Sequence, residues 1–155
     1  MSFVRKAKKS VDFTPVLDTN VYASGDRVGG IHTLSVGGEH VTLKSISVSD
    51  TANQGAELVV HFFNVLPTSV GSDNAALTVS DADIVNYVGS VVVGNTAYDL
   101  TSAASAAAYE DGIDMGFDTS ASSGRVYAIV ETLGTPTYTA SALRFRYGFE
   151  YDHKG

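Results

Sequence analysis

The sequence predicts an all-β fold: a single-domain antiparallel β-sandwich, jelly-roll-like, with a short extended N-terminal arm. Short apolar runs, several of them alternating with polar residues, are separated by turns rich in Gly, Asn, Asp and Pro, which is typical of a sandwich of many short strands. A strand-helix-strand spacing and internal repeats are both absent. A chain of 155 residues with 44% hydrophobic side chains can build one core and is too short for two good ones.

The run ELVVHFFNVL, from Glu57 to Leu66, is predicted to be an internal strand that is covered on both sides. Its β-branched and aromatic side chains suit a packed, pleated surface. They alternate between two faces, with Leu58, Val60 and Phe62 on one face and Val59, Phe63 and Val65 on the other. We therefore expect this strand to anchor the core.

The first half of the chain also contains a strand whose apolar phase changes. In VTLKSISVSD the apolar residues stand at odd positions up to Leu43 and at even positions from Ile46. A slip of one residue turns every later side chain to the opposite face of a sheet. We expect a β-bulge or bend near Lys44 and Ser45, of the kind that passes a strand from one sheet to the other.

The segments on either side of the internal strand are predicted to contain further extended chain and one short helix. The chain is extended from Val11 to Val16, where Pro15 restricts it to an edge or a strand end, and the segment IHTLSV is a short strand. Ser80 and Asp83 have the spacing of a capping box, which predicts a short helix from Asp81 to Tyr87.

The second half of the chain is predicted to contain five strands. Residues 91–93 and 96–100 form two strands joined at Gly94-Asn95, while residues 101–108 form either a helical turn or a loop. GIDMGF and RVYAIVET follow as strands, and the last strand alternates apolar residues with Arg144 and Arg146, which indicates one wet face.

Charge is distributed unevenly along the chain. Arg5, Lys6, Lys8 and Lys9 give the first nine residues a charge of +4, whereas the rest of the chain carries −11. We therefore divide the chain into a basic N-terminal arm, residues 1–10, and a sandwich domain, residues 11–155. An acidic body is unlike a nucleic-acid-binding surface, so no nucleic acid is expected as a partner. No apolar run reaches the roughly 18 residues of a membrane span, so no membrane partner is expected either.

Catalytic and metal-binding patterns are weak. His32, His40 and His61 lie on separate segments, unlike the paired histidines of a β-barrel metal site, and His153 is near the end. The acidic clusters lack the spacing of a calcium loop. The chain has no cysteine and no serine nucleophile elbow. We expect no enzyme activity, no catalytic residues, no metal and no cofactor.

Three turn-rich segments lie between predicted strands: YASGDRVGG at 22–30, SDNAALTVSDAD at 72–83 and GTPTY at 134–138. Taken together and in this order, they resemble the head decoration, or cement, proteins of tailed bacteriophages. The resemblance extends over residues 11–152 and includes a final L-x-F-x-Y strand that leads into Tyr151-Asp152. It implies a non-enzymatic virion protein on the outer surface of a capsid, made in the host cytoplasm, which bridges major capsid protein subunits, commonly as a homotrimer.

The basic arm is not explained by this resemblance, and its charge makes it the candidate anchor to the shell. The predicted capsid-binding residues are Phe3, Val4, Arg5, Lys6, Lys8 and Lys9. The alternative function is a carbohydrate-binding or host-attachment sandwich of a head or tail fibre. In that case exposed aromatic side chains such as Tyr22, Tyr109 and Tyr138 would stack on sugar rings.

Overall fold

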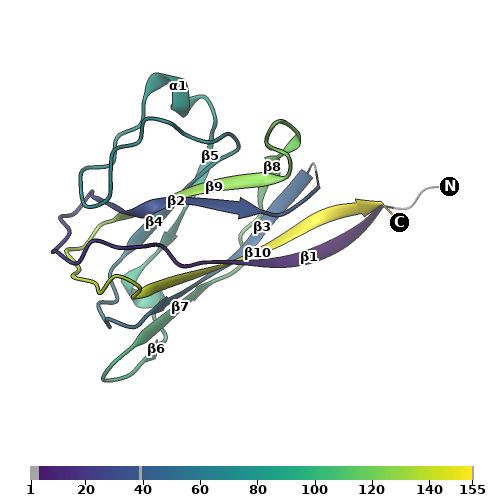
Figure 1. Cartoon of the computed structure of the whole chain (residues 1–155). Coiled ribbons are helices and arrows are strands. Elements are labelled where there is room, and N and C mark those ends of the chain that lie inside the picture. Colours follow the sequence, from purple (N-terminus) through teal and green to yellow (C-terminus); the bar gives the residue numbers. More distant parts are fainter. Residues whose placement is uncertain (1–3, 39, 155) are drawn as a thin grey trace.

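Two antiparallel sheets packed face to face make up the protein (Figure 1). The computed structural model describes residues 4–38 and 40–154, so Met1–Phe3, Glu39 and Gly155 lie outside the description. The strands of this part of the chain are β1 (Val4–Phe13), β2 (Arg27–Ser35), β3 (His40–Asp50), β4 (Leu58–Phe63), β5 (Tyr87–Val93), β6 (Leu100–Thr101), β7 (Ala106–Glu110), β8 (Met115–Asp118), β9 (Arg125–Thr132) and β10 (Leu143–Lys154). Its helices are α1 (Asp81–Ile84) and two 3-10 turns, η1 (Asn95–Ala97) and η2 (Ser120–Ser122).

The strand order is that of a jelly roll. One sheet runs β1-β10-β3-β7-β6, with β8 also paired to β3, and the other runs β2-β9-β4-β5. The chain passes back and forth between the sheets, so strands remote in sequence become neighbours, which is the double Greek-key arrangement. The prediction of a jelly-roll-like β-sandwich is confirmed.

β4 lies inside its sheet, between β9 and β5, as predicted. Leu58, Val60 and Phe62 face the main core and are completely buried. On the opposite face Phe63 packs in a second cluster with Val70, Tyr127 and Ile129. The strand ends at Phe63, so Val65, expected on this face, is instead 38% exposed in the connection that follows.

β10 has the alternation that the sequence predicts. Its core-facing side chains, Leu143, Phe145, Tyr147 and Phe149, are buried. Arg144 and Arg146 lie on the opposite, exposed face of the sheet. Phe62 of β4 meets Tyr147 with ring centroids 6.0 Å apart, so the two sheets interlock through aromatic contacts.

The predicted bulge in β3 is present. β10 pairs Gly148 with Ser45 but the next residue, Phe149, with Leu43, so Lys44 is the extra residue. Leu43 and Ile46 are both buried in the same core. The sequence suggested that the bulge would pass β3 to the other sheet, and this expectation is wrong, because β3 stays in one sheet on both sides of the bulge. The bulge restores the apolar side chains to the core face after the change of phase.

The helix predicted from Asp81 to Tyr87 is shorter, ending at Ile84. Ser80 is its N-cap, as predicted, because the Asp83 N–H donates to the Ser80 hydroxyl at 3.2 Å, and that hydroxyl donates to the Asp83 carboxylate at 3.0 Å. The reciprocal bond of a full capping box is replaced, since the Ser80 N–H donates to the Ser69 carbonyl at 3.2 Å. Within the described part of the chain, no helix is long and apolar enough to cross a membrane.

The strand predicted at 91–93 is confirmed as the end of β5, but the second strand predicted at 96–100 is wrong. Residues 95–97 form a 3-10 turn, and of the predicted range only Leu100 lies in a strand, β6. Tyr98 is the physical reason, since its ring is buried and its hydroxyl donates to the Ala56 carbonyl at 2.8 Å. The undecided run from 101 to 108 ends in β7, which begins at Ala106.

Candidate functional site

β1 forms an exposed basic edge of the six-stranded sheet. It pairs with β10 over ten residues and begins the strand order of that sheet. The strand crosses the proposed boundary between Ser10 and Val11 without interruption, so the described part of the arm is a sheet strand. In Figure 1 the β1-β10 ribbon extends beyond the rest of the sandwich toward both chain termini.

The structure brings four of the six predicted capsid-binding side chains together on this strand. Arg5, Lys6, Lys8 and Lys9 are all exposed on β1. Val4 begins the strand through its backbone pairing with Lys154, whereas Phe3 lies outside the described residues.

Most of this basic charge is available to a partner. Lys6 forms an ion pair with Asp152 at 2.6 Å, and hydrogen bonding to that carboxylate raises the pKa of Lys6. Arg5, Lys8 and Lys9 form no ion pair within the described residues. A partner that approaches this edge therefore meets three cations with few internal contacts to break.

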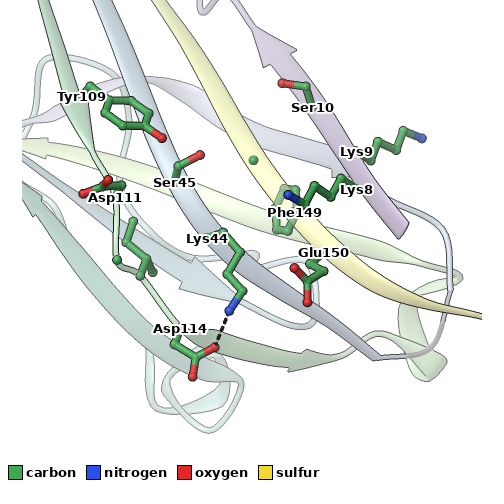
Figure 2. Close-up of a pocket in the computed structure, with 13 residues that line it drawn as sticks. Lys8, Lys9, Ser10, Lys44, Ser45, Tyr109, Asp111, Asp114, Phe149 and Glu150 are labelled. Atoms are coloured by element: carbon green, nitrogen blue, oxygen red, sulfur yellow. Dashed lines mark hydrogen bonds and ion pairs between the residues drawn. The ribbon is translucent and has the colours of Figure 1, made fainter. Parts of the chain in front are cut away.

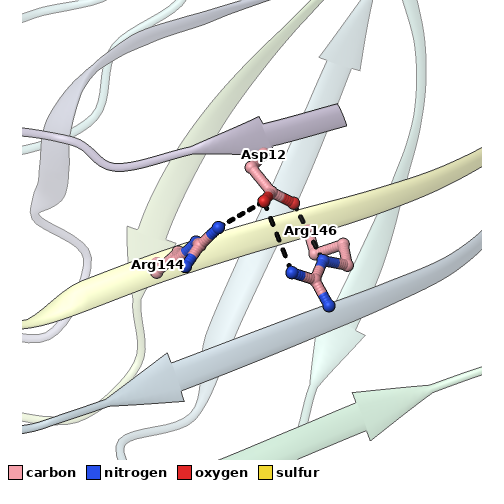
Figure 3. Close-up of polar contacts among 3 residues, drawn as sticks. All are labelled: Asp12, Arg144 and Arg146. Carbon is pink, nitrogen blue, oxygen red and sulfur yellow. Dashed lines mark hydrogen bonds and ion pairs between the residues drawn. The ribbon is translucent and has the colours of Figure 1, made fainter. Parts of the chain in front are cut away.

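Farther along β1, Asp12 fixes the strand to β10 (Figure 3). Its carboxylate accepts hydrogen bonds from Arg146, with Nε at 2.9 Å, and from Arg144. These hydrogen bonds lower the pKa of Asp12 to about 2. The two arginines thus hold the edge strand in place, and the free basic surface is confined to the distal half of β1.

A groove lies on the outer face of the same sheet, beside the bulge in β3 (Figure 2). Pairing of β3 with β7 stops at Ile46 and pairing with β8 starts at Leu43. The connection 111–114 crosses this gap and is held by the Ile113 N–H donating to the Lys44 carbonyl at 3.2 Å. The groove has a volume of about 710 Å³ and is lined by side chains or backbone of β1, β10, β3, β7 and this connection.

The floor of the groove depends on a missing side chain. A Cβ atom on Gly148 would lie 2.3 Å from the Ser45 hydroxyl oxygen, so that hydroxyl would have to move to make room for it. Tyr109 stands at one wall, 55% exposed, and Lys44 pairs with Asp114 at another wall, at 3.1 Å. The bulge thus creates a hollow that has an aromatic side chain, hydroxyls and charged groups.

The other two tyrosines proposed as exposed aromatics are buried, so that expectation is wrong. Tyr22 is completely buried and Tyr138 is 2% exposed, with ring centroids 5.9 Å apart. Asp73 accepts hydrogen bonds from the Tyr22 hydroxyl and the Gly29 N–H, each at 2.7 Å. The Tyr22 N–H donates to Pro136 at 2.9 Å. The three segments that carry the family resemblance therefore meet at one end of the sandwich, where these residues stabilise loops.

Two of the histidines, His32 and His61, are engaged with tyrosine and glutamate side chains. Among the described residues no group of three or more His, Cys, Asp or Glu side chains could hold a metal ion. His61 has its Nε2 atom 2.9 Å from the Glu131 carboxylate and its Nδ1 atom 3.2 Å from the Tyr87 hydroxyl. His32 is completely buried, with its Nδ1 atom at the Tyr147 hydroxyl.

Comparisons with known proteins do not assign a family. No family model and no curated protein matches the chain. Among solved structures it is similar to the VP2 subviral particle protein of infectious bursal disease virus, with 12% identity, a TM-score of 0.37 and 95% of this chain covered. It spans about a third of that protein, 32% of its length.

Two plant virus structures are similar at the same low level. Desmodium yellow mottle tymovirus has 10% identity and a TM-score of 0.30, with 97% of this chain and 84% of the virus chain covered. Empty heads of turnip yellow mosaic virus have 11% identity and a TM-score of 0.33, with 100% and 83% covered. Likenesses this weak carry no argument about function, which has to be inferred from the chain itself.

Proposed function

We propose that this protein is a non-enzymatic structural protein of a virion, which decorates and stabilises a bacteriophage capsid by bridging neighbouring major capsid protein subunits on the outer surface. The observation that carries the proposal is the exposed basic strand β1 at the edge of an otherwise acidic jelly roll. Jelly rolls serve as viral capsid domains, and the resemblance of the three loop segments to cement proteins supports the same role.

β1 is suited to binding an extended segment of another protein. An edge strand presents unpaired N–H and C=O groups to which such a segment can add as a further strand. Pairing with β1 of a second copy is disfavoured, because Lys8 and Lys9 would then face other cations. An extended acidic segment of a capsid subunit would pair with the free backbone N–H and C=O groups of β1 and would also neutralise its positive charges.

Binding at this edge requires several interactions together. An exposed ion pair contributes only about 0.2 to 1 kcal/mol, so Arg5, Lys8 and Lys9 give a modest total. Backbone hydrogen bonds along β1 add to it, and contacts at several equivalent subunits multiply the affinity.

We further propose that the protein assembles as a homotrimer through a different surface. Exposed apolar side chains lie in and beside α1: Val65, Leu66, Val79, Ile84, Val85 and Tyr87. The Asn64 N–H donates to the Asn86 carbonyl at 3.1 Å, which holds the two ends of this connection side by side. Apolar side chains gathered on a surface often mark contacts between subunits. Light scattering coupled to size-exclusion chromatography tests this proposal, and a monomer at high concentration would contradict it.

The shell-binding test uses charge substitution, since deletion of residues 4–9 would remove most of β1. Lys8→Thr/Lys9→Thr removes two charges and keeps strand-forming residues. Arg125→Thr removes an exposed charge on β9, in the other sheet, and is the control. Binding is measured by co-sedimentation with shells of the same virus that lack this protein.

We expect the Lys8/Lys9 variant to bind more weakly and to lose much of the salt dependence of the unaltered protein. The control variant should bind like the unaltered protein. Equal affinity and equal salt dependence for all three proteins would contradict the role of β1. Absence of binding by the unaltered protein would contradict decoration itself.

A further inference from the structure

The groove beside the bulge has the shape and lining of a small-ligand site. Its volume of about 710 Å³ lies within the usual range of 300 to 1,000 Å³ for such sites. Gly148 has no side chain to fill the bottom of the groove. Tyr109 stands at one wall, and its hydroxyl points toward Ser45 (Figure 2). A tyrosine that is 55% exposed leaves an apolar ring surface with a polar tip uncovered.

Cations and carboxylates both line the groove. Lys44 forms an ion pair with Asp114 at 3.1 Å, and Lys8 lies opposite Glu150 on the neighbouring strand without forming an ion pair with it. Lys9 is paired directly with Phe149, so the two side chains are on the same, core-facing side of the sheet. The charge of Lys9 is therefore directed away from the groove, which lies on the outer face. A site in which cations and carboxylates offset one another selects neither a strong anion nor a strong cation.

Hydrogen-bonding groups remain available for a neutral ligand. Asp111 forms no ion pair in the described part of the chain, and its carboxylate can accept two or more hydrogen bonds. The hydroxyls of Ser10 and Ser45 lie in the same groove and can both donate and accept. The lining therefore combines an aromatic platform with carboxylate and hydroxyl groups and little net charge.

We propose that this groove binds a short neutral oligosaccharide. Tyr109 stacks on the apolar face of one sugar ring, while Asp111 and Ser45 bind its hydroxyls. A sugar ring has one apolar face and a rim of hydroxyls, which matches the lining in both respects. The proposed sugar contacts are made by Tyr109, Asp111 and Ser45, whereas the proposed capsid docking uses the charges of β1. The two surfaces adjoin at Lys8, which also borders the groove.

The test begins with a glycan array of neutral, acidic and basic oligosaccharides probed with the full chain. Free neutral oligosaccharides that bind on the array are then titrated into isotopically labelled protein and followed by NMR. We expect amide shifts at residues 109–113 and at Gly148, with an affinity that does not change between low and high salt.

Variants then test the platform. Tyr109→Ala should weaken binding about ten-fold or more, because a removed aromatic anchor commonly costs that much, whereas Tyr109→Phe should retain most of it. Leu100→Ala, at an exposed side chain on β6 outside the groove, is the control and should leave the affinity unchanged. Thermal unfolding confirms that each variant is folded.

Three outcomes would overturn the proposal. These are binding of no neutral oligosaccharide at millimolar concentration, a preference for charged glycans, and an unchanged affinity in Tyr109→Ala. Shell binding by Tyr109→Ala is measured alongside. Loss of sugar binding with normal shell binding supports the groove, while weakened shell binding would show that Tyr109 serves the capsid contact instead.

Discussion

Acidification is expected to destabilise this protein through His32, a completely buried side chain on β2. Its ring stacks on Phe13 with centroids 4.2 Å apart and meets Phe145 edge-on at 4.9 Å. Nδ1 is hydrogen-bonded to the Tyr147 hydroxyl at 2.7 Å, and Nε2 has no hydrogen-bond partner among the described residues. Protonation would place a charge between aromatic rings.

The size and sign of the effect follow from the pKa. Burial lowers the pKa of His32 from 6.5 to about 3. Between these two values the unfolded chain binds a proton that the folded protein does not, so the free energy of unfolding falls as the pH falls. His32 stabilises the fold fully above pH 6.5, and at about pH 4 we expect a loss of roughly 3 kcal/mol.

The assay compares the unaltered protein with His32→Phe, which keeps an aromatic ring between Phe13 and Phe145 but cannot titrate. Urea unfolding at about pH 7.5 and about pH 4 gives two free energies for each protein. Carboxylates such as Asp12 contribute equally in both proteins, so they cancel. The pH-dependent loss should be roughly 3 kcal/mol larger in the unaltered protein.

An NMR titration of the His32 ring checks the cause directly. The ring should stay neutral in the folded protein down to about pH 4. A pKa near 6.5 in the folded state, or the same pH dependence in His32→Phe, would refute the reasoning. Either result would mean that water or an acidic group reaches the ring.

Two further predictions concern packing. Phe62→Ala and Phe145→Ala should each lower the free energy of unfolding by about 3 to 5 kcal/mol, because both side chains are completely buried, whereas the exposed Arg144→Ala should cost less than about 1 kcal/mol. Chemical denaturation that gives the reverse order would contradict the observed facing of β10. Gly148→Ala should cost about 1 to 3 kcal/mol through its contact with Ser45, and Ser45→Ala should remove most of that cost, since the Cβ atoms would be 3.6 Å apart. An equal cost in both backgrounds would show that the hydroxyl moves aside freely.

Strong local patterns were sufficient for several elements. The alternation in β10 and the apolar run of β4 predict which faces are buried, since side chains on a strand alternate strictly between two faces. The phase change around Lys44 locates the bulge for the same reason. The strand predicted at 96–100 failed because burial of Tyr98 overrode the local preference for a tight turn.

Long-range partners were not visible in the sequence. Tyr22 and Tyr138 were expected at the surface, yet both are buried. The Tyr22 hydroxyl donates to Asp73 and its N–H donates to the Pro136 carbonyl, and both partners are remote from Tyr22 in the chain. A turn motif indicates where the chain reverses and says nothing about which loop packs over it. The acidic residue of one motif and the tyrosine of another meet only after folding.

The sequence by itself determined the fold class, the positions of the long strands, the bulge and the separation of charge between β1 and the body, because each of these is a local or compositional property. The tertiary structure decided that β1 is an edge strand paired with β10, and that the bulge opens a groove. Lys8, Tyr109 and Gly148 line this groove from three strands. Jelly-roll pairings join distant segments through backbone hydrogen bonds that are alike for every residue, so local sequence does not encode which strands become neighbours.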